Sequence, residues 1–464
     1  MPTLFDRSGH VPARLAAALL VVAPVAVSQA SVQAQVPIAA VSASDVVAAA
    51  RRIIAARYVE PETAAKLDAA LAAAERNGEF AGLKGDALAQ RINAVMHTVT
   101  ADGHLGVRYQ PPMPGAGGPG PGPRIVTVPA PGGPAQAPGP QTGLQGLQQD
   151  IEREVVLANG GVQKLEILPG NVRYLDYRGF LAGTPAAEAA LAGAMAFLRG
   201  GDAIIIDLRR NGGGAVEAVS ALAGYFLKEG TPLMRFERRG EPSESSAAAR
   251  APFSLAGKPA YVLTGKSSFS AAEEFAAHAD AFGFAKLVGA PTGGGGFNNE
   301  FEPLPGGFVL SVSVGRTLHA LTGKSWEGLG VKPAIQTSEE AALDVALAEA
   351  LQAVLAKVRP EERPALERFS AFYTAKREGR GASRQLASYA GQYGPLTFTV
   401  AGDKLMAASP GRPPAVLQAL GPDRFANGNN PIQQWQFEFA GDMPSAVTVS
   451  DPRGDLVRLP RQAP

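Results

Sequence analysis

The sequence contains no cysteine among its 464 residues. This absence excludes disulfide bonds, a catalytic thiol and a lipidated N-terminal cysteine, and it suits an oxidising compartment outside the cytoplasm. Net charge is nearly absent too, because 43 basic residues offset 42 acidic ones. Composition therefore gives no support for nucleic-acid binding. The pattern G-x-x-x-x-G-K-[ST] is also missing, which argues against a phosphate-binding loop of that type.

The N-terminus has the pattern of a signal peptide, predicted over residues 1–34. Arg7 and Arg14 precede a short apolar run at residues 15–27, and small residues at 28–34 offer two cleavage sites. The run is too short to span a bilayer comfortably, and no later segment is apolar for about 18 residues. We therefore expect an exported protein, periplasmic or secreted, without stable membrane insertion.

Composition and periodicity then divide the rest of the chain. Residues 43–110 predict a helical subdomain, because Ala, Val, Ile and Leu recur there at helical spacing before a short β-like run. Residues 111–148 are rich in Pro and Gly and nearly free of charge, which predicts a linker. Strand-like and helix-like patterns alternate through residues 149–358, as in an α/β layered core. A helical connector at 359–383 and a small antiparallel β domain at 384–464 complete the prediction.

Ser270 lies where a β-run at residues 261–264 gives way to a helical pattern. Free backbone N–H groups and the positive end of the helix dipole gather at such a helix start. This favours a serine nucleophile with an oxyanion hole. The spacing of Ser270 and Glu273 is equally that of a capping box, in which both side chains only satisfy helix N–H groups. These residues alone favour the cap.

The glycine run and one histidine each allow both a structural and a functional interpretation. The glycines at residues 212–214 follow a buried strand-like run and suit a tight turn, but they also expose N–H groups to an anion or a tetrahedral oxyanion. His104 lies in a D-G-H turn, from which a loop can aim a side chain into a cleft. A lone histidine is nevertheless usually structural, so other motifs must decide.

Four motifs in order along the chain resemble one family. I-I-D-L-R-R-N-G-G-G at residues 205–214 and S-A-A-E at 270–273 resemble the tail-specific, or C-terminal processing, serine peptidases. D-G-H-L at 102–105 and W-E-G-L-G-V-K-P at 326–333 resemble the branch containing tricorn protease and bacterial proteins like interphotoreceptor retinoid-binding protein. The resemblance covers residues 45–355 apart from the Pro/Gly segment. It implies a crotonase-like ββα spiral core with an N-terminal helical subdomain.

The resemblance also implies roles for single residues. Ser270 would be the nucleophile, His104 its general base and Glu327 the group that orients or polarises the histidine. This suits the chemistry, because a serine hydroxyl needs a base and histidine titrates near neutrality. The family implies no metal or cofactor.

Backbone amides would complete the predicted site, and two positions depart from the family. The oxyanion hole would use the N–H groups of Gly213 and Ala271, with Gly212 as their neighbour. The processing peptidases carry a lysine base where this chain has Gly295, so a Ser–Lys dyad is not available. Tricorn-type sites place a relay serine where this chain has Gly103, so the predicted carboxylate reaches the histidine directly, through water, or not at all.

The sequence thus predicts an exported serine peptidase that acts on peptide or protein substrates, and it carries no signal for an oligomeric state. One alternative is a non-catalytic protein that binds hydrophobic ligands on the same fold, as some family members do. Another is a crotonase-like acyl-CoA enzyme, against which the export signal argues because CoA is cytosolic. The presence of Ser270, His104 and Glu327 favours the peptidase.

Overall fold

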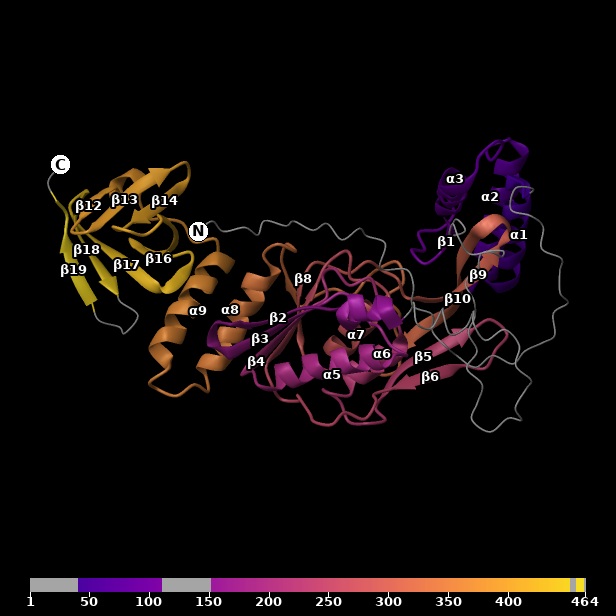
Figure 1. Ribbon diagram of the computed structural model, residues 1–464, viewed down its shortest axis with the longest axis horizontal. Helices are drawn as coiled ribbons and strands as arrows, with labels where there is room; N and C mark the ends of the chain where they lie inside the picture. Colours follow the sequence, from indigo (N-terminus) through magenta and orange to yellow (C-terminus); the bar gives the residue numbers. More distant parts are fainter. Residues whose placement is uncertain (1–40, 111–151, 451–455, 463–464) are drawn as a thin grey trace.

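The computed structural model describes residues 41–110, 152–450 and 456–462. The predicted signal peptide and Pro/Gly-rich linker lie outside these residues. The described parts form an elongated molecule with a β domain at one end, an α/β core in the middle and a helical subdomain at the other end (Figure 1). In the described ranges, no helix combines the length and the apolar character needed to cross a membrane.

The N-terminal helices pack on a sheet whose strands come from distant parts of the chain. A capping box of Ser42 and Asp45 begins the first helix, and Pro61 begins the second. The helices and strands of this region are α1 (Ala43–Arg57), α2 (Pro61–Arg76), α3 (Gly85–His97), β1 (Gly106–Tyr109), β5 (Pro232–Arg238), β6 (Glu244–Ala247), β9 (Phe297–Leu304) and β10 (Phe308–His319). The sheet order is β1-β10-β5-β6, with β9 also paired to β10. Leu310 of β10 is fully buried against the helices.

The central sheet has the order β11-β8-β7-β4-β3-β2 and is parallel except for β2. Its elements are β2 (Val162–Leu168), β3 (Val172–Tyr177), α5 (Pro185–Arg199), β4 (Ala203–Asp207), α6 (Val216–Ala223), β7 (Ala260–Thr264), α7 (Ala271–Ala281), β8 (Lys286–Gly289), β11 (Ile335–Gln336) and α8 (Ala342–Leu355). Ile204 and Ile206 face a core shared with α5, α6 and α7, whereas Ile205 faces α8. Burial on both faces explains why β4 is almost entirely apolar.

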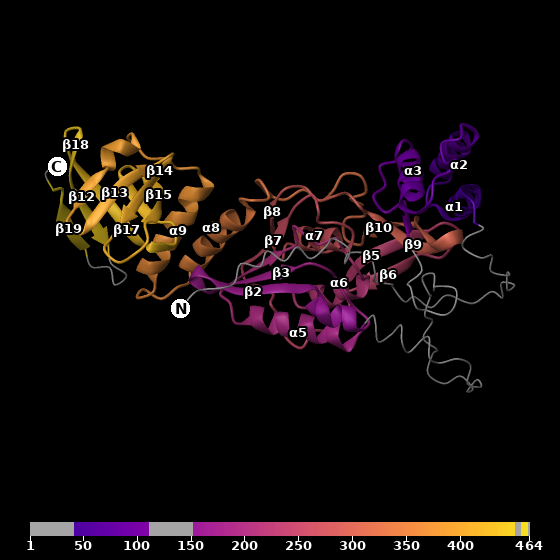
Figure 2. The ribbon, with the colours of Figure 1, turned by 45° about the horizontal axis from the view of Figure 1, so that its top comes forward.

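The C-terminal region confirms the predicted antiparallel β architecture. Helix α9 (Arg363–Arg377) packs on α8 and on the last sheet, as the two views show together (Figure 2). The eight strands pair in chain order: β12 (Gly391–Tyr393), β13 (Leu396–Ala401), β14 (Lys404–Ala408), β15 (Ala415–Gly421), β16 (Arg424–Asn427), β17 (Asn430–Ala440), β18 (Met443–Ser450) and β19 (Leu456–Pro460). The described residues also include the short 3₁₀ helices η3 (Asn159–Gly161), η4 (Pro169–Asn171), η5 (Pro305–Gly307) and η6 (Leu386–Tyr389).

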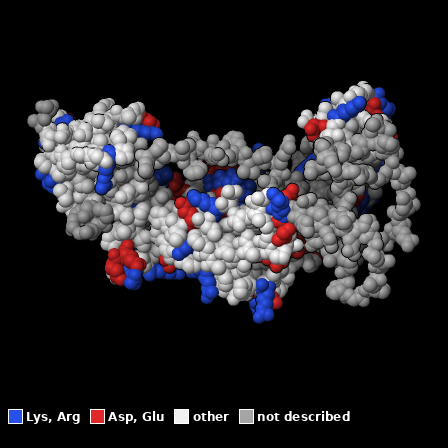
Figure 3. Space-filling view, viewed as in Figure 1, with Lys and Arg blue, Asp and Glu red and all other residues white. Residues whose placement is uncertain are grey.

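On the face shown in Figure 3, basic and acidic side chains are scattered among large uncharged areas. Neither sign covers that face as one continuous field. On the described part of this face, the side chains form no long basic track of the kind that follows a nucleic-acid backbone.

Candidate active site

The candidate site lies at the carboxyl ends of three neighbouring parallel strands. Strand β4 leads into the glycine turn at residues 208–215, β7 into the turn at 265–270, and β8 into the loop at 290–296. Open parallel sheets bind ligands at this edge, where loops from adjacent strands meet. The fold thus brings together the two predicted motifs around Ser270 and Gly213.

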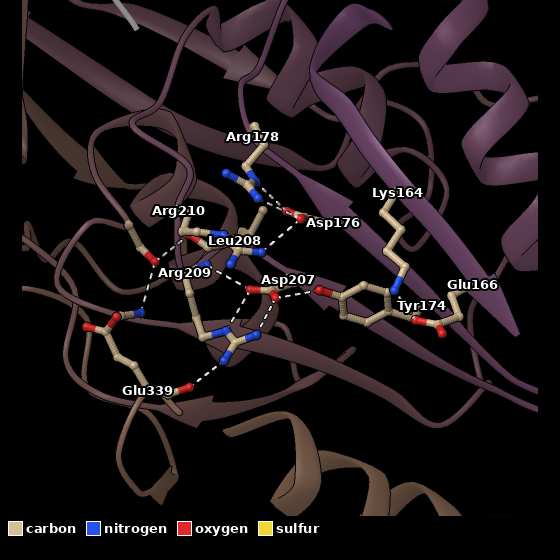
Figure 4. Close-up of polar contacts among 12 residues, drawn as sticks. Lys164, Glu166, Tyr174, Asp176, Arg178, Asp207, Leu208, Arg209, Arg210 and Glu339 are labelled. Carbon is tan, nitrogen blue, oxygen red and sulfur yellow. Dashed lines mark hydrogen bonds and ion pairs between the residues drawn. The ribbon is translucent and has the colours of Figure 1, made fainter. Parts of the chain in front are cut away.

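A network of ion pairs fixes the turn after β4 (Figure 4). Asp207 is buried, pairs with Arg209 through two hydrogen bonds of 2.9 and 2.6 Å, and accepts another from Tyr174 at 2.7 Å. Burial alone would raise the pKa of Asp207, but these hydrogen bonds and the charge of Arg209 lower it. Arg209 also donates to the carbonyl of Glu339. The glycine turn therefore starts from a rigid anchor.

Asn211 then shapes the glycine turn itself. Its buried side chain donates to the carbonyl of Tyr177 and accepts from the N–H of Gly213, each at 2.9 Å. Gly213 has φ +103°, and a Cβ there would lie 2.8 Å from Ser270 Cβ. Only glycine allows both this conformation and this close approach. The turn consequently packs directly against Ser270.

The backbone of Ser270 has φ 55° and ψ −120°. A capping serine is normally extended, and a non-glycine residue with positive φ stores about 1–3 kcal/mol of strain. Ser270 and Glu273 do face each other as in a capping box, but the Ser270 side chain makes no cap hydrogen bond. Such strain is typical of functional turns, so the conformation favours a chemical role over a cap alone.

Glu273 has a larger structural role than capping. Its fully buried carboxylate accepts four hydrogen bonds of 2.6 to 2.9 Å, donated by Ser270 N–H, Thr292 Oγ1, Gly294 N–H and Gly295 N–H. Burial raises the pKa of Glu273, and the hydrogen bonds oppose that rise without cancelling it. One side chain therefore holds the start of α7 against the glycine-rich loop that follows β8.

The predicted oxyanion donors are only partly free. The N–H of Gly213 is engaged by Asn211, whereas the N–H groups of Ala271 and Gly214 have no acceptor among the described residues. Ala271 and Gly214 line one small cavity together with Ser270. Gly212 is exposed next to them on the turn. In this structure the free donors beside the serine are thus Ala271 and Gly214.

His104 lies close to the serine turn, but it is not hydrogen-bonded to Ser270. Its imidazole is 9% exposed and packs on Phe269, with ring centroids 4.6 Å apart. Neither ring nitrogen has a hydrogen-bond partner among the described residues. Burial lowers the pKa of His104 to about 4, although the nearby charge of Asp102 opposes this. The predicted base is therefore neutral and next to the turn that carries the predicted nucleophile.

Glu327 is not hydrogen-bonded to His104 either. Its Oε2 accepts from the N–H groups of Gly296 and Phe297 at 2.6 and 2.8 Å. Burial and the charge of Asp102 raise the pKa of Glu327 to about 7, although those two hydrogen bonds oppose the rise. Of the alternatives that the sequence left open, the structure shows no direct hydrogen bond between this carboxylate and the imidazole, and backbone N–H groups of the glycine-rich loop hold the carboxylate.

Three contributors were missed from the sequence. Asn211 could have been found from the pattern of an Asx turn, in which an asparagine side chain accepts a hydrogen bond from the backbone N–H two residues later, here that of Gly213. Asp102 stands beside His104 in the same turn and accepts from the His104 N–H, Tyr58 and Ser313. Phe269 gave no sequence signal. Over the described ranges, no group of three His, Asp or Glu side chains could hold a metal ion.

The fold and the site define a class: an α/β protein with a serine-centred site at the carboxyl edge of a parallel sheet. Residues 171–337 match the model of peptidase family S41. Over that segment the chain is similar to the peptidase family that its motifs resemble. Ser270, the glycine turn and Glu327 lie within the matched residues, whereas His104 lies before them.

Individual proteins are similar to part of the chain. A carboxyl-terminal-processing protease of Picosynechococcus sp. is 33% identical over 118 residues, which is 25% of this chain and 28% of that protein. The match thus spans less than a third of the relative's length. The structure of a photosystem II D1 C-terminal processing protease is 16% identical, covers 65% of this chain and 94% of its own, and has a TM-score of 0.35. A lipoprotein from Streptococcus agalactiae is 12% identical, covers 71% and 100%, and has a TM-score of 0.46.

We predict that Glu273→Gln lowers the free energy of unfolding by about 1–3 kcal/mol, because the amide NH₂ would face two donors that now bind an oxygen. Urea unfolding measures this. The matched control is Glu188→Gln, an exposed acidic residue in the first turn of α5, which should stay within about 0.5 kcal/mol of wild type. Equal effects of the two changes would contradict the anchoring role of Glu273.

Glu327 should make stability depend on pH. Its pKa rises from 4.5 in an unperturbed chain to about 7 in the fold, so the folded protein ionises it less readily. Its contribution to stability is full below about pH 4.5 and is lost as pH rises through about 7. Glu327→Gln keeps an oxygen for both N–H donors and removes the charge. The variant should therefore gain stability relative to wild type between pH 5 and pH 8 in urea unfolding, whereas exposed Glu217→Gln should not.

Proposed function

We propose that this protein is an exported serine peptidase that hydrolyses peptide bonds through an acyl-enzyme on Ser270. The observation that carries the proposal is the backbone of Ser270, a strained non-glycine turn with φ 55° at the start of α7. That turn lies beside free N–H groups at the carboxyl edge of the sheet. The family match over residues 171–337 and the processing-protease relative support the same reaction class.

The proposed chemistry gives each residue a task. His104 Nε2 takes the proton of Ser270 Oγ as the oxygen attacks the scissile carbonyl carbon. The resulting oxyanion is held by Ala271 N–H and by an N–H of the turn formed by Gly212, Gly213 and Gly214. Collapse breaks the C–N bond, and His104 returns the proton to the leaving amine. Water then attacks the ester by the same route and frees the serine.

In the present structure Ser270 and His104 are not hydrogen-bonded, and apo sites commonly tighten only in the complex with substrate. Within this proposal, Glu327 acts on His104 through water or after a local shift, because its carboxylate now binds backbone N–H groups. Asp102 is a second carboxylate beside the imidazole. The crotonase-like spiral of the core, the tricorn-like branch and export through residues 1–34 are parts of the same proposal. Its substrates are peptides or proteins.

Ser270→Ala should abolish fluorophosphonate labelling and peptide cleavage while circular dichroism and thermal unfolding stay close to wild type. Loss of the hydroxyl removes the only atom that can be acylated in this scheme. Labelling is read by intact mass and by the modified peptide. Ser267→Ala, an exposed serine of the same turn, is the control that should keep full labelling. A wild-type protein that never labels, yet binds apolar ligands, would support the non-catalytic alternative instead.

The acid limb of kcat/KM should fall near pH 4, well below the ordinary histidine value of 6.5, because burial lowers the pKa of His104. The base is neutral above that pH, so activity rises as His104 loses its proton. His104→Ala should remove this limb together with several orders of magnitude in turnover, whereas exposed His97→Ala should change neither. A limb near pH 7 that Glu327→Gln abolishes would assign the titration to Glu327.

A further inference from the structure

The ring of Phe269 lies in a slot formed by glycines from two separate segments of the chain. A Cβ added to Gly103 would lie 2.8 Å from the ring, one on Gly293 also 2.8 Å, and one on Gly295 2.3 Å. Real Cβ atoms do not approach other atoms below 3.0 Å. None of the three glycines has a positive φ. Backbone conformation therefore does not require glycine at these three positions. Glycine is required because a side chain at any of them would occupy the space of the Phe269 ring.

The same ring contacts the imidazole of His104. The centroids are 4.6 Å apart, with the planes tilted by 41°. No hydrogen bond to either imidazole nitrogen is present in the described part of the chain. Asp102, the carboxylate whose charge acts on His104, and Glu327, its predicted partner, both bind other groups. Packing, rather than a hydrogen bond, therefore sets the orientation of the imidazole in this structure.

The backbone of Phe269 is fixed as well. Its N–H donates to the carbonyl of Asn211 at 3.0 Å, and its carbonyl accepts from Ala272 N–H at 3.1 Å. A phenylalanine side chain has two rotatable bonds, and the glycine slot selects one position of the ring. Because Ser270 is the next residue, the ring links the turn that carries the serine to the loop that carries His104.

We propose that Phe269 is a positioning residue, which holds the imidazole of His104 next to the Ser270 turn by packing in a slot of Gly103, Gly293 and Gly295. The proposal rests on the proposed function, in which His104 is the base. It assigns to an aromatic ring the orienting task that a carboxylate performs in a hydrogen-bonded triad.

The first test does not depend on activity and uses the Ser270→Ala protein. Proton NMR records the imidazole signals of His104, identified by their loss in His104→Ala, over a pH titration. Phe269→Leu and Gly295→Ala should each shift these signals, because the ring is removed or displaced, and should move the His104 titration toward the ordinary 6.5. Two controls should leave them unchanged: Phe253→Leu, a partly buried ring elsewhere, and Gly193→Ala, whose Cβ would meet nothing within 4 Å.

The second test uses the active protein. Phe269→Leu should lower kcat about 10- to 100-fold with little change in KM, since a displaced catalytic group costs rate rather than ground-state binding. Gly295→Ala should be similarly harmful alone, but it should cost little more when combined with Phe269→Leu, because the ring that it displaces is gone. In both variants, the pH at which kcat/KM falls on the acid side should rise together with the pKa of His104 measured by NMR.

These experiments test the positioning role of Phe269 separately from the proposed peptidase function. Unchanged His104 signals in both variants, or fully additive costs in the double variant, would overturn the positioning role even if Ser270 labels normally. Failure of wild-type labelling would remove the proposed function, while the NMR titration would still decide whether the ring holds His104. If Phe269→Leu does not fold, Gly295→Ala alone still displaces the ring and carries the NMR test.

Discussion

The site depends on the carboxylate of Glu273. A buried polar group costs free energy unless it is hydrogen-bonded, and this carboxylate receives all four of its hydrogen bonds only when two loops adopt one mutual arrangement. The bond to Ser270 N–H holds the strained turn, and the bonds to the glycine-rich loop fix the segment after β8. That loop then accepts the indole N–H of Trp326 at Gly295 and so places Glu327 beside it. One side chain thus links two of the four motifs, those around Ser270 and Glu327, through the glycine-rich loop between them.

Much of the architecture could be predicted because its signals are local. The predicted alternation of strand-like and helix-like patterns within residues 149–358 includes the apolar strand β4 and the helix α5, which Thr184 caps. The long hairpin of β9 and β10 gave no comparable signal, because most β9 residues are half-buried and polar residues interrupt the alternation. It forms because β10 packs under the N-terminal helices and pairs with strands on both sides. Those contacts are tertiary, so periodicity does not show them.

At the candidate site, too, some features could be predicted from the sequence and others could not. Ser270 and Gly213 could be placed together because both follow parallel strands whose carboxyl ends meet at one edge. The hydrogen-bond partners at the site could not be predicted from strand order, because the acceptors for each N–H come close only when the loops have folded. Asn211 therefore holds the Gly213 N–H, and backbone amides hold Glu327, where the motifs alone suggested an oxyanion donor and a partner of the histidine.

Gly103 and Gly295 show why single positions mislead. In the sequence they are two unrelated departures from the family: Gly103 stands where a relay serine is expected, and Gly295 where a lysine base is expected. In the fold the three atoms nearest to a Cβ at either position all belong to Phe269, so both absences satisfy one packing requirement. The exchange has a chemical cost. Packing removes water from His104 and lowers its pKa to about 4, which keeps it neutral but makes it a weaker proton acceptor. In the proposed mechanism, His104 is therefore a fixed, uncharged base of low basicity, and the free amides beside Ser270 would have to compensate by stabilising the oxyanion.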